Sequence, residues 1–210
     1  MILLIAILVG AVVGWLVARG QHRGWTLPPL RGVWLVVVGF LPQFFAFYLP
    51  ATRTRIPNVW VSAGLLSSQF LLFLFCWLNR RLSGSWLMAF GLTLNLLVIA
   101  TNGGFMPISP QTVGRLVPQE VVQTIPLGSR VNNSKDILLL PEQTQLEWLA
   151  DRYVSPGGLP YRVAFSLGDI AIAAGAFWLV ASQGKSLELT EKTFKEAECY
   201  RPRHINHPSL

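Results

Sequence analysis

The sequence predicts an all-α membrane protein: a bundle of about five transmembrane helices with a folded extracytoplasmic segment between the fourth and the fifth. Of the 210 residues, 52% are hydrophobic and only 13% are charged, whereas a soluble domain is about 25% charged. The mean hydropathy of +0.46 points the same way. Five apolar runs approach the roughly 20 residues that cross a bilayer. They are Ile2–Ala18, Val33–Leu49, Trp60–Leu78, Trp86–Thr101 and Val163–Ser182.

The first run is expected to be a retained helix, because a signal peptide carries a basic residue before its apolar core and only Met1 precedes this one. Lys and Arg are concentrated in the segments that face the cytoplasm if the N-terminus lies outside and the C-terminus inside. The exception is the short outer loop Ala51–Val59, which carries Arg53 and Arg55. Residues 1–182 therefore form the predicted membrane domain, with 102–162 as an extracytoplasmic cap. Residues 183–210 are expected to be a partly disordered cytoplasmic tail.

The composition excludes several classes of partner. The formal net charge of +7 is attributed to inner loops and not to nucleic-acid binding, since no basic patch is interleaved with aromatic residues. No phosphate loop, haem attachment motif or zinc spacing is present, so no cofactor or metal is predicted. Cys76 and Cys199 are expected to be free thiols. The expected partners are the lipid bilayer and either other membrane subunits or a second copy of the chain.

Polar side chains inside the runs define a candidate site. Asp169 stands about seven residues into the fifth run, where an unpaired carboxylate would be costly. Counted from the outer end of each run, polar residues of three other runs lie at a similar depth, so they are predicted to form one layer near the outer face. These residues are Asn95, Gln43 and Gln69. Interhelical hydrogen bonding is the alternative role for the amides.

Small residues suggest where helices approach closely. Ala164, Gly168, Ala171 and Gly175 follow one face of the fifth run, and the first run carries Gly10 and Gly14. These two helices are expected to pair with each other or with another subunit.

The predicted cap opens with TNGGFMPIS, where two glycines permit positive φ and Pro107 bars further helix. Thr112–Thr124, interrupted by Pro118, predicts a pair of short interfacial helices. Glu142–Tyr153 predicts another short helix.

Several of these motifs occur in a fixed order. They are N-G-G-F-M-P at 102–107, S-K at 134–135, L-x-D at 149–151 and F-S-L-G-D at 165–169. In this order the chain resembles a bacterial membrane family, domain-of-unknown-function family 5317, over most of its length. The resemblance implies an integral protein of the bacterial plasma (inner) membrane in which Asn102, Lys135, Asp151 and Asp169 belong together. It implies no activity.

Three function classes remain open. The first is a non-catalytic subunit or assembly partner of a larger membrane complex, in which Asp169 pairs with Lys135 or Arg162, near Asn95 and Asn102. The second is a small-molecule or lipid-binding, transporter-like protein with its site at this polar layer. The third is an intramembrane aspartyl hydrolase, because ADRYVSPGGLPYRVAFSLGDIAIAAGA is similar in outline to lipoprotein signal peptidase, with Asp151 and Asp169 as the catalytic pair.

Overall fold

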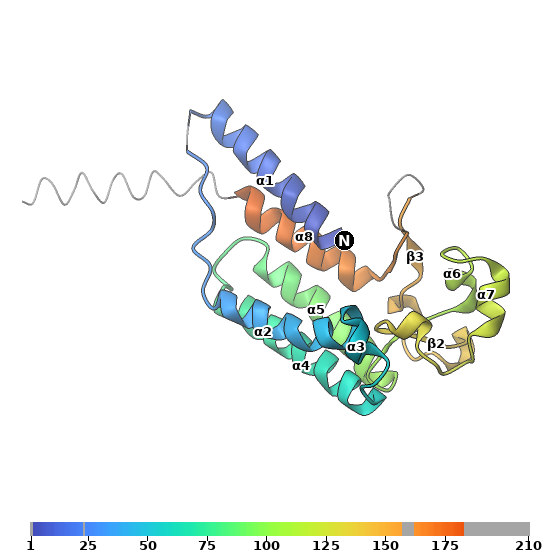
Figure 1. Ribbon diagram of the computed structural model, residues 1–210. Coiled ribbons are helices and arrows are strands. Elements are labelled where there is room, and N and C mark those ends of the chain that lie inside the picture. The colour runs from blue at the N-terminus through green and yellow to red at the C-terminus, as the bar shows by residue number, and fades with distance from the viewer. Residues whose placement is uncertain (1, 23, 157–161, 183–210) are drawn as a thin grey trace, which may run out of the picture.

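The long elements of the protein are helices, as Figure 1 shows for the computed structural model, which describes residues 2–22, 24–156 and 162–182. The helices are α1 (Ile2–Gly20), α2 (Val33–Gln43), which the π-helical turn η1 (Phe44–Tyr48) continues, the short α3 (Pro50–Arg53), α4 (Asn58–Leu78), α5 (Ser85–Thr101) and α8 (Leu167–Ala181). The predicted helical class is therefore confirmed. The predicted tail lies outside the described residues.

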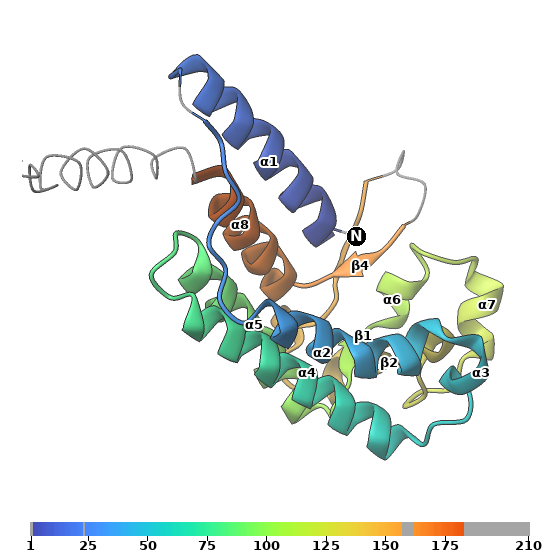
Figure 2. The ribbon, with the colours of Figure 1, turned by 60° about the vertical axis from the view of Figure 1, so that its left-hand side comes forward.

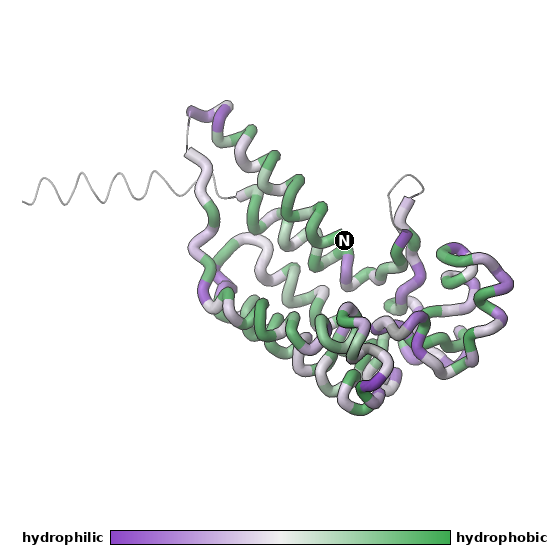
Figure 3. Tube along the Cα trace, in the orientation of Figure 1, coloured by the Kyte–Doolittle hydropathy of each residue, from purple (hydrophilic) through white to green (hydrophobic). Residues whose placement is uncertain are grey.

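Two of these helices, α1 and α4, are long and apolar enough to cross a membrane, while α2 with η1, α5 and α8 are shorter apolar helices. Figure 3 shows hydrophobic residues along all of them and hydrophilic residues gathered in the connections and in the segment between α5 and α8. That five helices cross a bilayer, and that the segment after α5 lies outside it, stay predictions.

The five long helices form an open row. α8 packs between α1 and α5, α5 also packs on α4, and α4 packs on α2. The order of contacts is therefore α1, α8, α5, α4, α2, and both ribbon views show α8 between α1 and the pair of α2 and α4 (Figures 1 and 2). Each end helix packs chiefly on one neighbour, so much of its surface stays free of protein.

Glycines allow α8 to pack closely on both of its neighbours. A Cβ on Gly10 of α1 would lie 2.8 Å from the carbonyl oxygen of Phe177 in α8. On the other side of α8, a Cβ on Gly175 would lie 2.7 Å from the carbonyl oxygen of Gly84, just before α5. Both distances are too short for a side chain, so the backbones meet directly. α1 and α8 therefore pair with each other as predicted, but the glycines of α8 face α5.

The segment between α5 and α8, called the cap below, contains short strands that the sequence analysis did not predict. β1 (Met106–Ile108) pairs in parallel with β2 (Asp136–Leu138), and β3 (Tyr153–Val154) pairs antiparallel with β4 (Ala164–Phe165). α6 (Pro110–Val113) and α7 (Gln119–Thr124) form a pair of short helices before and after Pro118, but α6 begins before the expected Thr112 and ends at Val113. That the pair lies at a membrane interface stays a prediction. The apolar core of the cap contains Ile108, Val113, Val122, Val131 and Leu138.

Two predicted boundaries were wrong. The helix expected at Glu142–Tyr153 is replaced by the 3₁₀ turns η3 (Pro141–Gln143) and η4 (Glu147–Leu149), because Leu146 between them has a φ of 54°, which no α-helix accommodates. The 3₁₀ turn η2 (Val131–Asn133) precedes β2. The last long helix begins at Leu167 and not at Val163, because Ala164 and Phe165 pair as a strand with β3.

Candidate functional site

β1 brings two distant parts of the cap together near the C-terminal end of α5. On one side, the amide of Met106 donates to the carbonyl oxygen of Lys135, 3.0 Å away. On the other side, the amide of Asp151 donates to the carbonyl oxygen of Pro107, 3.1 Å away. Since the same short strand holds both backbones, the side chains of Lys135 and Asp151 meet beside it.

Lys135 binds two carboxylates. Its Nζ lies 2.6 Å from Oδ2 of Asp151 and 3.2 Å from Oδ1 of Asp136. The Asp151 side chain is 1% exposed, whereas that of Lys135 is 35% exposed. Among the described residues, Oδ1 of Asp151 has no hydrogen-bond partner. Ser134 holds the carboxylate of Asp136 in place, since its hydroxyl donates to Oδ2 of Asp136 over 3.1 Å.

Asp169 belongs to a second cluster, at the start of α8. Ser166 is the N-cap residue: its Oγ accepts from the amide of Asp169 at 3.1 Å, and Oδ2 of Asp169 accepts from the amide of Ser166 at 3.1 Å. This reciprocal pair is a capping box. Asn95 of α5 completes the cluster, because its amide group donates to Oδ1 of Asp169 and its Oδ1 accepts from the hydroxyl of Ser166, both at 2.9 Å.

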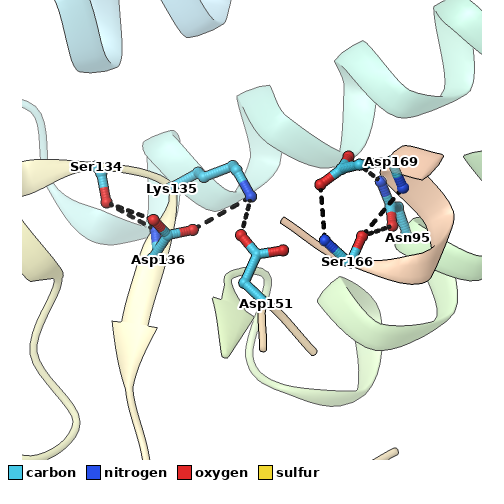
Figure 4. A network of polar contacts seen from close by, with 7 residues as sticks. All are labelled: Asn95, Ser134, Lys135, Asp136, Asp151, Ser166 and Asp169. Carbon is cyan, nitrogen blue, oxygen red and sulfur yellow. Dashed lines mark hydrogen bonds and ion pairs between the residues drawn. The ribbon is translucent and has the colours of Figure 1, made fainter. Parts of the chain in front are cut away.

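The two clusters lie side by side and are treated below as one polar network (Figure 4). The network consists of Asn95, Ser134, Lys135, Asp136, Asp151, Ser166 and Asp169. Figure 4 shows the ammonium of Lys135 above Asp151, and the second oxygen of Asp151 pointing toward the side on which Ser166 and Asp169 lie. One ammonium thus faces three carboxylates where the cap meets α5 and α8.

The crowding of carboxylates changes the acidity of both members of the central pair. Burial raises the pKa of the Asp151 carboxyl against the attraction of Lys135, and together with the charges of Asp136 and Asp169 it brings this pKa to about 7. Desolvation lowers the pKa of Lys135, but the charges of Asp136, Asp151 and Asp169 outweigh it and hold this pKa well above the usual value. The lysine is therefore charged at neutral pH, and Asp151 titrates there.

The structure brings some of the predicted site residues together and separates others. Asp169, Asn95, Lys135 and Asp151 all lie in the polar network. Asn102 lies at the C-terminal end of α5, where its side chain bonds the backbone amide and carbonyl of Gln145, each over 2.9 Å. It therefore fastens the cap to α5 and does not bond Asp169.

The expected direct ion pair of Asp169 with Lys135 or Arg162 was wrong. Lys135 donates to Asp151 instead, and Nη1 of Arg162 donates to the carbonyl oxygen of Arg115 over 3.0 Å. The oxygens of Asp169 take their hydrogen bonds from Asn95 and Ser166, so the carboxylate needs no adjacent cation. The charge of Asp169 still helps to raise the pKa of Lys135.

The two glutamines of the predicted layer remain apart from the network. Within the part of the chain that the structure describes, no hydrogen bond reaches Oε1 of Gln69, which is buried in α4. Its neighbour Ser68 instead donates to the carbonyl oxygen of Gly39 and so joins α4 to α2. Gln43 is the last residue of α2 and is partly exposed. The layer is therefore made by α5, α8 and the cap.

Three members of the network were not named as site residues by the sequence analysis: Ser134, Asp136 and Ser166. A usable signal existed for Ser166, because S-x-x-D before an apolar run is the signature of a capping box. No comparable signal marked Asp136, whose place depends on the pairing of β2 with β1.

Replacing Ser166 by alanine is expected to destabilise the start of α8 by about 2 kcal/mol, because it removes the N-cap and leaves Oδ1 of Asn95 without its donor. Hydrogen exchange of the first amides of α8 measures the effect. Ser67→Ala is the matched control, since Ser67 is exposed and its hydroxyl donates to the carbonyl oxygen of Ala63 in the same helix. Equal exchange in both variants would contradict the capping role.

Comparison with known proteins gives one match. Residues 28–181 match the model of a family described as "Family of unknown function (DUF5317)". No curated protein and no solved structure matches the chain. The matched residues include four of the five long helices and the whole cap, so the polar network lies inside the matched region.

Proposed function

The chain belongs to the family of unknown function DUF5317, and we propose from its geometry that it is a membrane-embedded, non-catalytic subunit or assembly partner of a larger membrane complex. One observation carries the proposal. The polar groups at the junction of cap and helices bond one another, while the helices at the ends of the row present long apolar faces that no other described part of the chain covers.

The exposed faces are apolar except for Arg19 in the last turn of α1. On α1, Leu8 is 57% exposed, Val12 56% and Leu16 54%. On α2, Trp34 is 63% exposed and Val37 58%. Soluble monomers rarely expose contiguous apolar patches of this kind, so lipid tails and neighbouring apolar helices are the surroundings that fit.

Residues at the helix ends support a position in the membrane and the predicted orientation, with the N-terminus outside and the C-terminus inside. At the turn between α4 and α5, Trp77 and Trp86 pack edge to face, and the guanidinium of Arg80 lies 4.8 Å from the centroid of the Trp77 ring. Tryptophan together with arginine is typical of the cytoplasmic interface. The cap lies at the opposite end of α5, so the proposal puts it outside, with all five helices crossing and the shorter ones tilted or in a thinned bilayer.

The polar network supports a structural role over the hydrolase alternative. An aspartyl hydrolase needs two carboxylates that share a proton and hold a water between them. Here one oxygen of Asp151 is held by Lys135, and both oxygens of Asp169 are held by Asn95 and Ser166. The network therefore joins the cap to α5 and α8, and gives a rigid outer surface to a small helix row.

Native mass spectrometry of the protein, extracted gently from its own membrane, tests the proposal. We expect a stoichiometric set of other subunits to co-purify. A lone monomer with a reproducible small adduct would instead favour the ligand-binding alternative. A lone species without an adduct would call for a search for turnover that depends on Asp151 and Asp169.

A photo-crosslinking residue locates the contact with a partner. Placed at Leu8, on the free face of α1, it is expected to capture another protein chain. Placed at Phe90 of the central helix α5, which is 57% exposed, it is expected to capture lipid. Capture of lipid alone at both positions would contradict an assembly through the end helices.

A further inference from the structure

The cap contains a cavity of about 400 Å³ that the polar network does not use. Its lining comes from β3 and from segments that follow β1, β2 and η3, and it includes Ser109, Thr112, Arg115, Glu147, Arg152 and Tyr153. A volume of this size is within the range of small-molecule sites. Asp151 and Arg152 are consecutive, and while the first side chain is buried in the polar network, the second lies in the wall of this cavity.

Positive charge exceeds negative charge around the cavity. Arg115 and Arg152 both line it, and Arg162 is tied to it through its hydrogen bond to the carbonyl oxygen of Arg115. The one carboxylate of the lining, Glu147, lies 3.5 Å from Arg152 and offsets only part of this charge. Within the described ranges, the guanidinium of Arg115 has no hydrogen bond or ion pair, so its donors are available to a ligand.

The wall also offers a hydroxyl donor. Ser109 and Thr112 face each other with their hydroxyl oxygens 3.1 Å apart, and Oγ of Ser109 accepts from the amide of Thr112. The two hydroxyls have two protons, and their mutual bond uses only one. The other proton can be donated to an acceptor in the cavity.

We propose that this cavity binds the phosphate group of a small phosphate ester, held by the guanidiniums of Arg115 and Arg152 and by a hydroxyl of Ser109 or Thr112. A phosphate fits because its oxygens accept from several directions, and arginine donates to it in pairs. The cavity is larger than a phosphate, which leaves room for the esterified group beside the Tyr153 ring. That ring is fixed by stacking on Phe165, with the centroids 5.8 Å apart.

A soluble phosphate ester and an anionic lipid headgroup share this chemistry, and two probes separate them. The full-length protein, purified and delipidated in a non-ionic detergent, is titrated by calorimetry at constant ionic strength. The probes are glycerol 3-phosphate and dihexanoyl phosphatidylglycerol. Saturable binding of glycerol 3-phosphate assigns a soluble ester, and binding of the lipid alone assigns a headgroup.

The double variant Arg115→Gln, Arg152→Gln is expected to weaken, at least tenfold, the binding of whichever probe binds the unchanged protein. Arg80→Gln, in the turn between α4 and α5 at the end of α5 away from the cap, is the matched control. It is expected to bind the probe as the unchanged protein does. Both substituted arginines of the cap are exposed, and an unchanged melting temperature shows that the variant is folded. The proposal is overturned if neither probe saturates, or if the two variants bind alike. The titration needs no partner subunit, so its failure is independent of the proposed role in assembly.

Discussion

Replacing Gly168 by alanine is expected to separate α8 from α5 and to destabilise the protein by about 3 kcal/mol or more, because one added methyl group meets both a backbone atom and the polar network. A Cβ at this position would lie 2.8 Å from the carbonyl oxygen of Gly91 and would overlap Oδ1 of Asn95. The carbonyl oxygen belongs to a helix and cannot move alone.

Two responses to the added methyl group are available, and both cost stability. If the Asn95 side chain turns away, Asp169 loses a donor and Ser166 loses its acceptor. If α8 moves away instead, the close contacts of Gly175 with the α5 side are lost as well. The effect of Gly168→Ala is therefore larger than the usual cost of overpacking.

Thermal unfolding in detergent and hydrogen exchange of α8 measure the loss. Gly20→Ala is the matched control, since Gly20 ends α1 and a Cβ there meets no atom within 4 Å. The control is expected to be neutral or slightly stabilising. A Gly168→Ala variant as stable as Gly20→Ala would show that the α5–α8 contact is looser than the structure has it.

The long helices could be predicted from the sequence, because an apolar run of about 16 to 20 residues is too long for a typical strand and favours a helix. The sequence was insufficient for the position of Asp169 within its helix. The run begins at Val163, but Ala164 and Phe165 form a strand that pairs with β3, and hydropathy does not distinguish an apolar strand from the first turn of an apolar helix. The capping box at Ser166 was the signal that could have corrected the boundary.

The partner of Lys135 could not be found from spacing. Lys135 and Asp151 meet because both flank β1, a strand of three residues in a parallel pair. Such a strand is too short for a periodic pattern, and its parallel partner lies about 30 residues further along the chain. The motif order suggested that Asn102, Lys135, Asp151 and Asp169 belong together. Only the fold shows that Asn102 serves a separate contact.

The second large effect is expected from pH, through Asp151. The pKa of its carboxyl is about 7 in the folded protein, against an ordinary value of 3.8. The folded protein therefore holds the proton more tightly than the unfolded chain. The stability that this carboxyl contributes is complete below about pH 4 and falls as the pH rises from about 4 to about 7, by about 1.4 kcal/mol per pH unit and about 4 kcal/mol in all.

Asp151→Asn is expected to remove this dependence. The amide is uncharged at every pH and keeps an oxygen for Lys135, so the stability of the cap should stay nearly constant between pH 4 and 8. Lys135→Met is expected to do the opposite. Without the ammonium, the pKa of Asp151 rises further, since Asp136 and Asp169 still repel its charge. The loss of stability then still begins near pH 4, but it continues to a higher pH and is larger in all.

Hydrogen exchange of the cap amides, measured at several pH values and corrected for the intrinsic exchange rate, follows all three proteins. Glu142→Gln is the matched control, because it removes one carboxylate from an exposed position of the same cap. It is expected to show the same pH profile as the unchanged protein. If Asp151→Asn also follows the unchanged profile, then the titrating group lies elsewhere. In that case Asp151 is ionised at neutral pH, and its ion pair with Lys135 outweighs the cost of burying its charge.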